Sequence, residues 1–185
     1  MMLLLAGVST LSFAKTCTWI GGSGKWSDAA KWEDGGKPVA GDIVDVRNDA
    51  ADAVIENDIS GLVLSRLFVT GDAACELNGQ SVTLTDANAF SNGVVNTVCS
   101  LPMVFTAQNP YLYSAGAAVF NGALTSQSAK TFTIHLSRAV KYALTFNCEI
   151  NMPNSDIFVM PNANVNERAA HFKGKVVAKS VFKRI

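Results

Sequence analysis

The chain has 185 residues, which is enough for one domain with a sizeable hydrophobic core. Hydrophobic residues make up 49% of it and charged residues only 16%, and fifteen acidic side chains balance fifteen basic ones. A neutral chain creates no overall field that would attract nucleic acid or an anionic membrane, so we expect no nucleic-acid partner.

The charged side chains are unevenly distributed along the chain. Residues 1–86 carry twelve acids and six bases, whereas residues 87–185 carry three acids and nine bases. No charged residue occurs between Asp86 and Lys130, where Ser, Thr, Asn, Gln and Gly supply the polarity. Acid–base catalysis needs ionisable side chains, so we expect no catalytic centre in this middle stretch.

The first residues are typical of an export signal. An apolar run over residues 1–8 precedes the small residues Ser12 and Ala14, which suit a cleavage site. The run is too short to span a bilayer as a helix, so we expect no membrane-spanning segment after signal removal. No Lys or Arg precedes the run, and a buried N-terminal strand is the alternative. We predict a signal peptide at 1–14, a single domain at 15–185 and a secreted or cell-surface location.

All three tryptophans occur in one segment, "TWIGGSGKWSDAAKW", at residues 18–32. It is not a phosphate-binding loop, because its Gly-Lys pair is followed by Trp26 instead of Ser or Thr. Trp19, Trp26 and Trp32 then have two interpretations. As part of an N-terminal cap at 16–46, they would cover the apolar end of the fold. As a carbohydrate platform, they would be exposed and would stack against sugar rings. We favour the cap and keep the platform as the alternative binding site.

The remaining chain consists of short apolar alternations separated by turn signals. Three Asn-Gly and two Gly-Asp pairs mark tight corners, because Gly and Asn tolerate a positive φ. Residues 131–136, "TFTIHL", illustrate the alternation: Phe132, Ile134 and Leu136 share one face of a strand, and His135 points to the other. Many short strands with closely spaced turns predict an all-β fold.

Two all-β architectures fit this pattern, a parallel β-helix (solenoid) and an antiparallel β-sandwich. Strand-like runs recur after roughly twenty residues, close to one turn of a solenoid. The uncharged middle also favours the solenoid, because stacked like charges would repel while stacked Asn, Ser and Thr form hydrogen bonds along a ladder. We therefore predict a parallel β-solenoid, with the antiparallel β-sandwich as the alternative.

The N-terminal half resembles the entry segment of bacterial surface proteins with autotransporter-like passenger β-solenoids. The resemblance covers about residues 16–85 and includes the later "LNGQSVTL" stretch. It rests on the following positions: Thr18, Trp19, Gly21, Gly22, Gly24, Trp26, Ser27, Asp28, Trp32, Gly35, Gly36, Pro38, Gly41, Asp42, Val44 and Val46. Lys31 stands where the group usually has Asn. The chain is short for the group, so the resemblance implies either a fragment of a longer protein or a passenger-like protein anchored by other means.

The four cysteines, Cys17, Cys75, Cys99 and Cys148, have wide and irregular spacings. No C-x-x-C pair occurs, which speaks against a zinc site or a thioredoxin-like centre. An exported protein can oxidise its thiols, and four cysteines allow three pairings. We predict buried free thiols or at most one disulfide bond.

No metal site, cofactor or catalytic residue is predicted. The acidic stretch at 42–58 lacks the spacing of a calcium loop, and we expect turn caps and solvated edges there. The two histidines, His135 and His171, have no motif around them that suggests a catalytic triad. The basic run at 173–184 is expected to be a solvated strand whose lysines protect a sheet edge.

Three functions remain open, and the first is favoured. It is a secreted or cell-surface structural or adhesin-type solenoid without catalytic activity, whose partners would be surface glycans or host or matrix proteins. The second is a glycan-binding module that uses the tryptophans. The third is a polysaccharide-degrading β-helix enzyme, which would need paired carboxylates or a base beside bound calcium.

Overall fold

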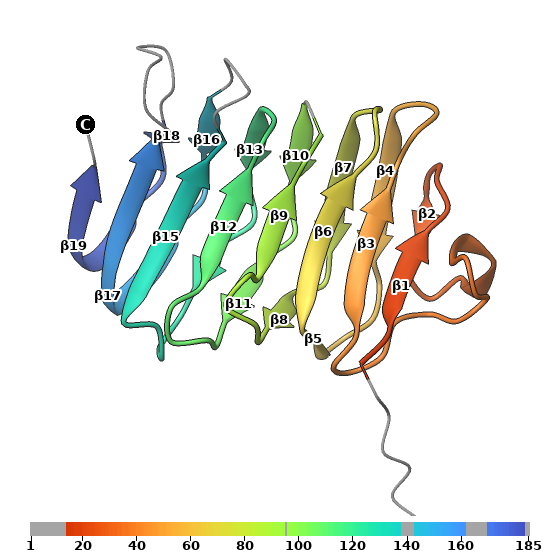
Figure 1. The fold of residues 1–185 in the computed structure, drawn as a ribbon, viewed down its shortest axis with the longest axis horizontal. Coiled ribbons are helices and arrows are strands. Elements are labelled where there is room, and N and C mark those ends of the chain that lie inside the picture. Colours follow the sequence, from red (N-terminus) through yellow and green to blue (C-terminus); the bar gives the residue numbers. More distant parts are fainter. Residues whose placement is uncertain (1–13, 95, 138–142, 162–169, 184–185) are drawn as a thin grey trace, which may run out of the picture.

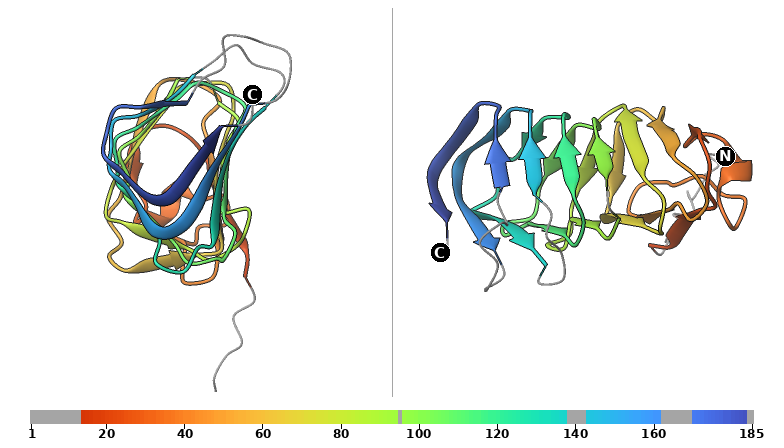
Figure 2. Two further views of the ribbon diagram at one scale, coloured as in Figure 1. Left: turned by 90° about the vertical axis from the view of Figure 1, so that its left-hand side faces the viewer. Right: turned by 90° about the horizontal axis from the view of Figure 1, so that it is seen from above.

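The computed structural model describes residues 14–94, 96–137, 143–161 and 170–183, so the predicted signal peptide lies outside the described part except for Ala14. Strands make up 53% of the described residues and wind into a β-solenoid of about seven turns (Figure 1). Its cross-section is closed when it is viewed along the axis (Figure 2). The described strands pair in parallel with those of the neighbouring turns. The prediction of a parallel solenoid is therefore confirmed, and the alternative antiparallel sandwich is wrong.

Each full turn contributes one strand to each of three stacks. The front stack contains β1 (Thr16–Trp19), β3 (Ile43–Arg47), β6 (Arg66–Thr70), β9 (Phe90–Asn92), β12 (Tyr111–Ser114) and β15 (Thr131–Leu136). The back stack contains β2 (Gly24–Lys25), β4 (Ala53–Asn57), β7 (Cys75–Gly79), β10 (Thr97–Cys99), β13 (Ala118–Phe120), β16 (Leu144–Phe146) and β18 (Ala170–Phe172). The lower stack contains β5 (Leu62–Leu64), β8 (Val82–Leu84), β11 (Met103–Phe105) and β14 (Leu124–Thr125).

Two longer strands join the lower stack to the front stack at the C-terminal end. They are β17 (Ile150–Pro161), which pairs with β14 and then with β15, and β19 (Val176–Lys183), which pairs with β17. A short 3-10 helix, η1 (Ala29–Lys31), interrupts the first turn, and Asp28 caps it by accepting a hydrogen bond from the backbone N–H of Ala30. From β3 onwards, each turn is slightly longer than the roughly twenty residues expected, as the register pairs of the front stack show.

The core consists of columns of inward side chains that the parallel register aligns. Three phenylalanines of the back stack, Phe120, Phe146 and Phe172, occupy one register position on successive turns. Their rings stack with centroid distances of 4.9 and 5.2 Å and interplanar angles of 13° and 12°. These distances match the spacing of about 4.8 Å between paired strands, so the backbone ladder and the ring stack reinforce each other.

Buried asparagines link one turn to the next at the corners. The side-chain amide of Asn48 donates to the carbonyl oxygens of Ala51 at 2.7 Å and of Ala74 at 2.8 Å. The amide of Asn57 donates in the same way to the carbonyl oxygen of Gln80 at 2.7 Å. Asn48 and Asn57 are fully buried, so these hydrogen bonds give partners to side-chain amides whose burial without them would be costly.

The four cysteines are buried free thiols, and none of these described residues forms a disulfide bond. Burial raises the pKa of Cys17, Cys75 and Cys148 to about 11 and that of Cys99 to about 12. For Cys17, the neighbouring Asp42 carboxylate raises the pKa further. Thiols with these pKa values are poor nucleophiles at neutral pH, and they serve here as small core side chains.

Candidate functional site

The three indoles lie together in the core of the first turn. Trp19, Trp26 and Trp32 are 0%, 1% and 2% exposed. Trp32 meets the other two edge to face, with centroid distances of 5.1 Å to Trp19 and 6.0 Å to Trp26. Its Nε1 donates a hydrogen bond to the carbonyl oxygen of Trp26 at 2.9 Å, and the Nε1 of Trp19 donates to that of Gly22 at 3.1 Å.

This burial contradicts the predicted carbohydrate platform at Trp19, Trp26 and Trp32. A sugar ring stacks on an exposed aromatic face, and here all three faces are covered by protein. The platform prediction is therefore wrong in this structure. The cluster instead fills the N-terminal end of the core, which is the position that the cap interpretation expects.

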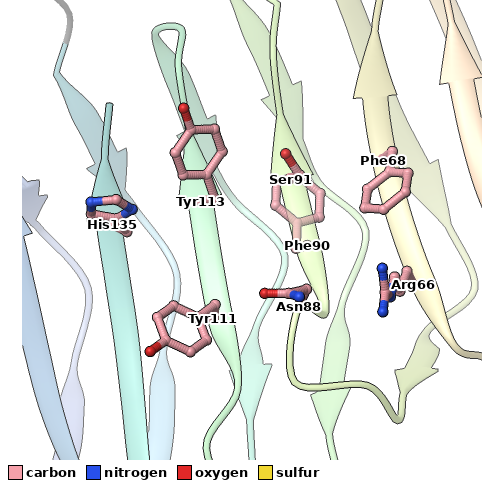
Figure 3. Close-up of a pocket in the computed structure, with 8 residues that line it drawn as sticks. All are labelled: Arg66, Phe68, Asn88, Phe90, Ser91, Tyr111, Tyr113 and His135. Atoms are coloured by element: carbon pink, nitrogen blue, oxygen red, sulfur yellow. The ribbon is translucent and has the colours of Figure 1, made fainter. Parts of the chain in front are cut away.

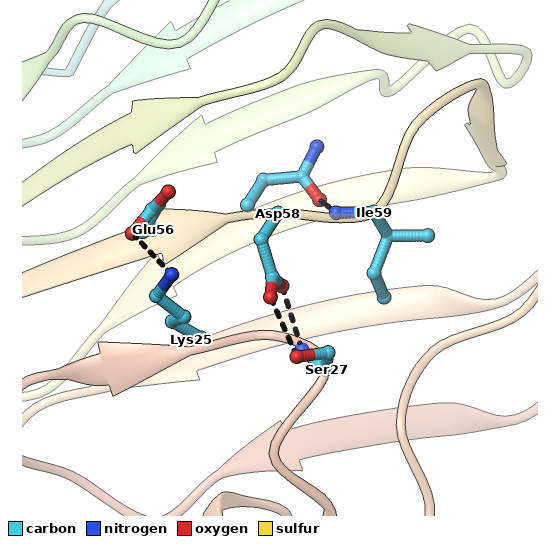
Figure 4. A network of polar contacts seen from close by, with 6 residues as sticks. Lys25, Ser27, Glu56, Asp58 and Ile59 are labelled. Carbon is cyan, nitrogen blue, oxygen red and sulfur yellow. Dashed lines mark hydrogen bonds and ion pairs between the residues drawn. The ribbon is translucent and has the colours of Figure 1, made fainter.

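A polar network fastens the first turn to the second (Figure 4). The backbone N–H and the hydroxyl of Ser27 donate to the two carboxylate oxygens of Asp58 at 2.9 and 2.6 Å. The hydrogen bond from the Ser27 hydroxyl lowers the pKa of Asp58, because it stabilises the charged carboxylate. Beside it, Lys25 Nζ lies 3.6 Å from Glu56 Oε2. These contacts lie on the solvent side of the indoles and hold the entry segment in place.

A groove of about 400 Å³ hollows the outer side of the front stack (Figure 3). Its side chains come from four successive strands, β6, β9, β12 and β15, and from the loop before β9. We call it the aromatic groove and define it by Arg66, Phe68, Ser91, Tyr111, Tyr113 and His135. Tyr111 is 42% exposed, and the other side chains of the set are half-buried.

The strand register creates the shape of the aromatic groove. Phe68, Ser91, Tyr113 and His135 occupy one outward position on successive turns. Two strand spacings of about 4.8 Å separate Phe68 from Tyr113, so these strands are about 10 Å apart with only the short Ser91 side chain between them. Figure 3 shows this gap, with Tyr111 below Tyr113 on the same strand. The rings of Tyr113 and His135 lie 5.5 Å apart at 51°.

The one guanidinium that lines the aromatic groove is neutralised by a neighbouring carboxylate. Arg66 Nη2 donates to Asp86 Oδ2 at 2.9 Å, and Asp86 Oδ1 accepts from the backbone N–H of Asn88 at 2.9 Å. Burial alone would raise the pKa of Asp86, but the hydrogen bonds and charge of Arg66 and the backbone N–H groups outweigh it, so the pKa is lowered. The carboxylate therefore stays ionised at neutral pH, and the groove carries no uncompensated cation.

The described part of the chain shows no cluster of side chains that could hold a metal ion. No group of three or more His, Cys, Asp or Glu side chains converges there. None of the residues that line the aromatic groove has a carboxylate or a thiol side chain.

The acidic stretch at 42–58 differs in part from the prediction of turn caps and solvated edges. Asp42 is fully buried and accepts hydrogen bonds from the backbone N–H groups of Val39 at 2.9 Å and Lys15 at 3.2 Å. Its role is to fix the entry to β3.

The aromatic groove was not predicted from the sequence. The outward position of His135 was predicted correctly, but its neighbours Phe68, Ser91 and Tyr113 lie a full turn apart from one another and look unrelated along the chain. A signal does exist in the sequence, because an aromatic or polar residue recurs once per turn. Recognising that recurrence requires the length of each turn to be known accurately.

Comparison with known proteins identifies no relative. No family model matches the chain, and no curated protein or solved structure is significantly similar to it. Within the described residues, no helix is long and apolar enough to cross a membrane.

Proposed function

We propose that this protein is a secreted or cell-surface β-solenoid that acts as a structural or adhesin-type element and catalyses no reaction. The observation that carries the proposal is the unbroken parallel stack of the front strands from β1 to β19. Seven strand spacings of about 4.8 Å give a body with an axial length of roughly 34 Å. Such a body presents side chains at fixed intervals along its length, which suits a stalk or an adhesin that displays an extended binding surface.

The outer chemistry supports a role without catalysis. Polysaccharide-degrading reactions use a pair of carboxylates or a base beside bound calcium. The aromatic groove has no carboxylate in its lining, and the nearby Asp86 is held by Arg66. Neighbouring turns instead exchange hydrogen bonds between neutral side chains, such as Thr131 Oγ1 to Asn109 Oδ1 at 2.8 Å.

The location part of the proposal rests on the sequence. The apolar run at 1–8 and the small residues before position 15 suit an export signal, and the entry segment resembles those of bacterial surface proteins with passenger solenoids. The natural partners under this proposal are surface glycans or proteins of a host or matrix.

The location is tested by protease treatment of intact cells that express the full chain. We expect the protein to be digested on intact cells or found in the medium, while a cytoplasmic marker stays protected. A variant with Leu3→Asp and Leu4→Asp interrupts the apolar run and should be retained inside. Protection of the wild-type chain from protease in intact cells would refute the surface location.

The absence of catalysis is tested separately. Purified protein is incubated with plant, algal and bacterial polysaccharides, with and without calcium, and new reducing ends and unsaturated products are measured. We expect no release above a heat-denatured control. Sustained product formation that scales with protein concentration would contradict the proposal.

A further inference from the structure

We propose that the aromatic groove is a binding site for an uncharged carbohydrate chain. The site is distinct from the buried tryptophans, and the inference goes beyond the structural function without depending on it. The volume of about 400 Å³ falls within the range of about 300–1,000 Å³ that is usual for ligand sites. Because the groove runs across four strands of a rigid stack, it is formed before any ligand binds.

The aromatic side chains supply stacking surfaces. Phe68, Tyr111 and Tyr113 are partly exposed on one face, and the rings of Tyr111 and Tyr113 are seen broadside in Figure 3. Clustered exposed aromatic groups on a charge-poor surface mark an interaction site more often than isolated ones do. A sugar ring offers an apolar face of C–H groups, which packs against an aromatic ring, and a rim of hydroxyls, which needs polar partners.

The polar groups between the rings match that hydroxyl rim. Ser91 and the two tyrosines carry hydroxyls, Asn88 carries an amide, and His135 carries an imidazole. All of these side chains contain both hydrogen-bond donors and acceptors, as a sugar hydroxyl does. A purely apolar ligand would leave them without partners, at a cost in free energy. The mixture therefore favours a ligand that is apolar on one face and hydroxylated at its edge.

The charge of the groove selects an uncharged chain. Arg66 is the only Lys or Arg in the lining, and Asp86 neutralises it at 2.9 Å. Polyanions such as nucleic acids or sulfated glycans gain most of their affinity from several uncompensated cations, which this lining does not provide.

The topology disfavours an extended peptide. Peptides commonly bind β-proteins by adding a strand to an open sheet edge. The four strands beneath the groove lie in the middle of the front stack, and each already pairs with a neighbour on both sides. The backbone there has no free edge to offer, so recognition depends on side chains that project from the face of the sheet.

Binding is tested with the full chain and with immobilised and soluble hexasaccharides as probes. The uncharged probes are β-linked hexamers of glucose, xylose, mannose and N-acetylglucosamine. A hexamer of galacturonic acid, a single-stranded oligonucleotide and an apolar peptide represent the other ligand classes. We expect at least one uncharged hexamer to bind at micromolar to millimolar concentration with little dependence on salt. If no uncharged hexamer binds at millimolar concentration, or if only the anionic probes bind, the proposal is overturned.

Substitutions then locate the binding site. Tyr113→Ala removes a stacking ring and should weaken binding by about tenfold or more, whereas Tyr113→Phe keeps the ring and should change it by only a few-fold. Phe182→Ala is the matched control, because it removes a partly exposed aromatic ring from the same side of the solenoid outside the groove. Unchanged binding by Tyr113→Ala, with a wild-type circular dichroism spectrum, would refute the assignment. The protease test of location is independent of this result.

Discussion

The stacked phenylalanines allow burial and stacking to be separated in one experiment. Phe146 is fully buried, and its ring stacks on Phe120 at 4.9 Å and on Phe172 at 5.2 Å. Phe182 stacks on Phe158 at a similar distance of 5.0 Å, but it is 49% exposed. Both rings belong to axial stacks with nearly parallel planes, but Phe146 is buried between two rings, whereas Phe182 is half exposed and stacks on one.

We expect Phe146→Ala to lower the free energy of unfolding by about 4 kcal/mol, because it removes a buried ring and leaves a cavity that the rigid strand ladder cannot close. Phe182→Ala should cost about 1 kcal/mol, since the native ring buries only half of its surface and water replaces it. Urea unfolding followed by circular dichroism measures the difference. A loss for Phe146→Ala no more than about twice that for Phe182→Ala would refute the reasoning, because two stacked neighbours against one would then explain the difference without burial.

Three further predictions concern the first turns and the thiols. Ser27→Ala should lower stability, because it removes a hydrogen bond that lowers the pKa of Asp58; the loss should be full above the ordinary carboxyl pKa of 3.8 and shrink as the pH falls through the lowered pKa. Thermal unfolding of both proteins from pH 7 to pH 2 measures this, and a difference that does not depend on pH would contradict it. Gly79→Ala should destabilise the protein by roughly 2 kcal/mol or more, because Gly79 has a φ of 102° and a Cβ there would collide with the Asn57 carbonyl oxygen. Gly41 has a similar φ of 91° but open space around it, so Gly41→Ala should cost only about 1 kcal/mol in the same urea titration. The four thiols should not react with a thiol reagent at pH 8 in the native protein and should all react in denaturant; fast native labelling would show that burial does not protect them.

Local side-chain patterns were sufficient to predict the class of fold and many inward positions. Strict alternation places Phe132, Ile134 and Leu136 in the core and His135 outside, and the structure confirms each of these positions. Thr133 is an exception, because it is outward by alternation yet only 8% exposed. It lies in register between Tyr111 and Phe158, two larger outward side chains on the adjacent turns. Alternation describes one strand at a time, so it contains no information about such neighbours.

The sequence by itself determined that the chain would form short strands with an apolar face, few ionisable groups in its middle and a cluster of indoles near its start. Only the tertiary structure decided what those features do. The tryptophans lie inside because the first turn folds back on itself, with Trp19 and Trp32 forming an antiparallel bridge. The aromatic groove exists because successive turns of nearly equal length bring Phe68, Ser91 and Tyr113 to one outward row. Side-chain periodicity is a local property of the backbone, whereas the register between turns depends on the length and packing of every corner between them.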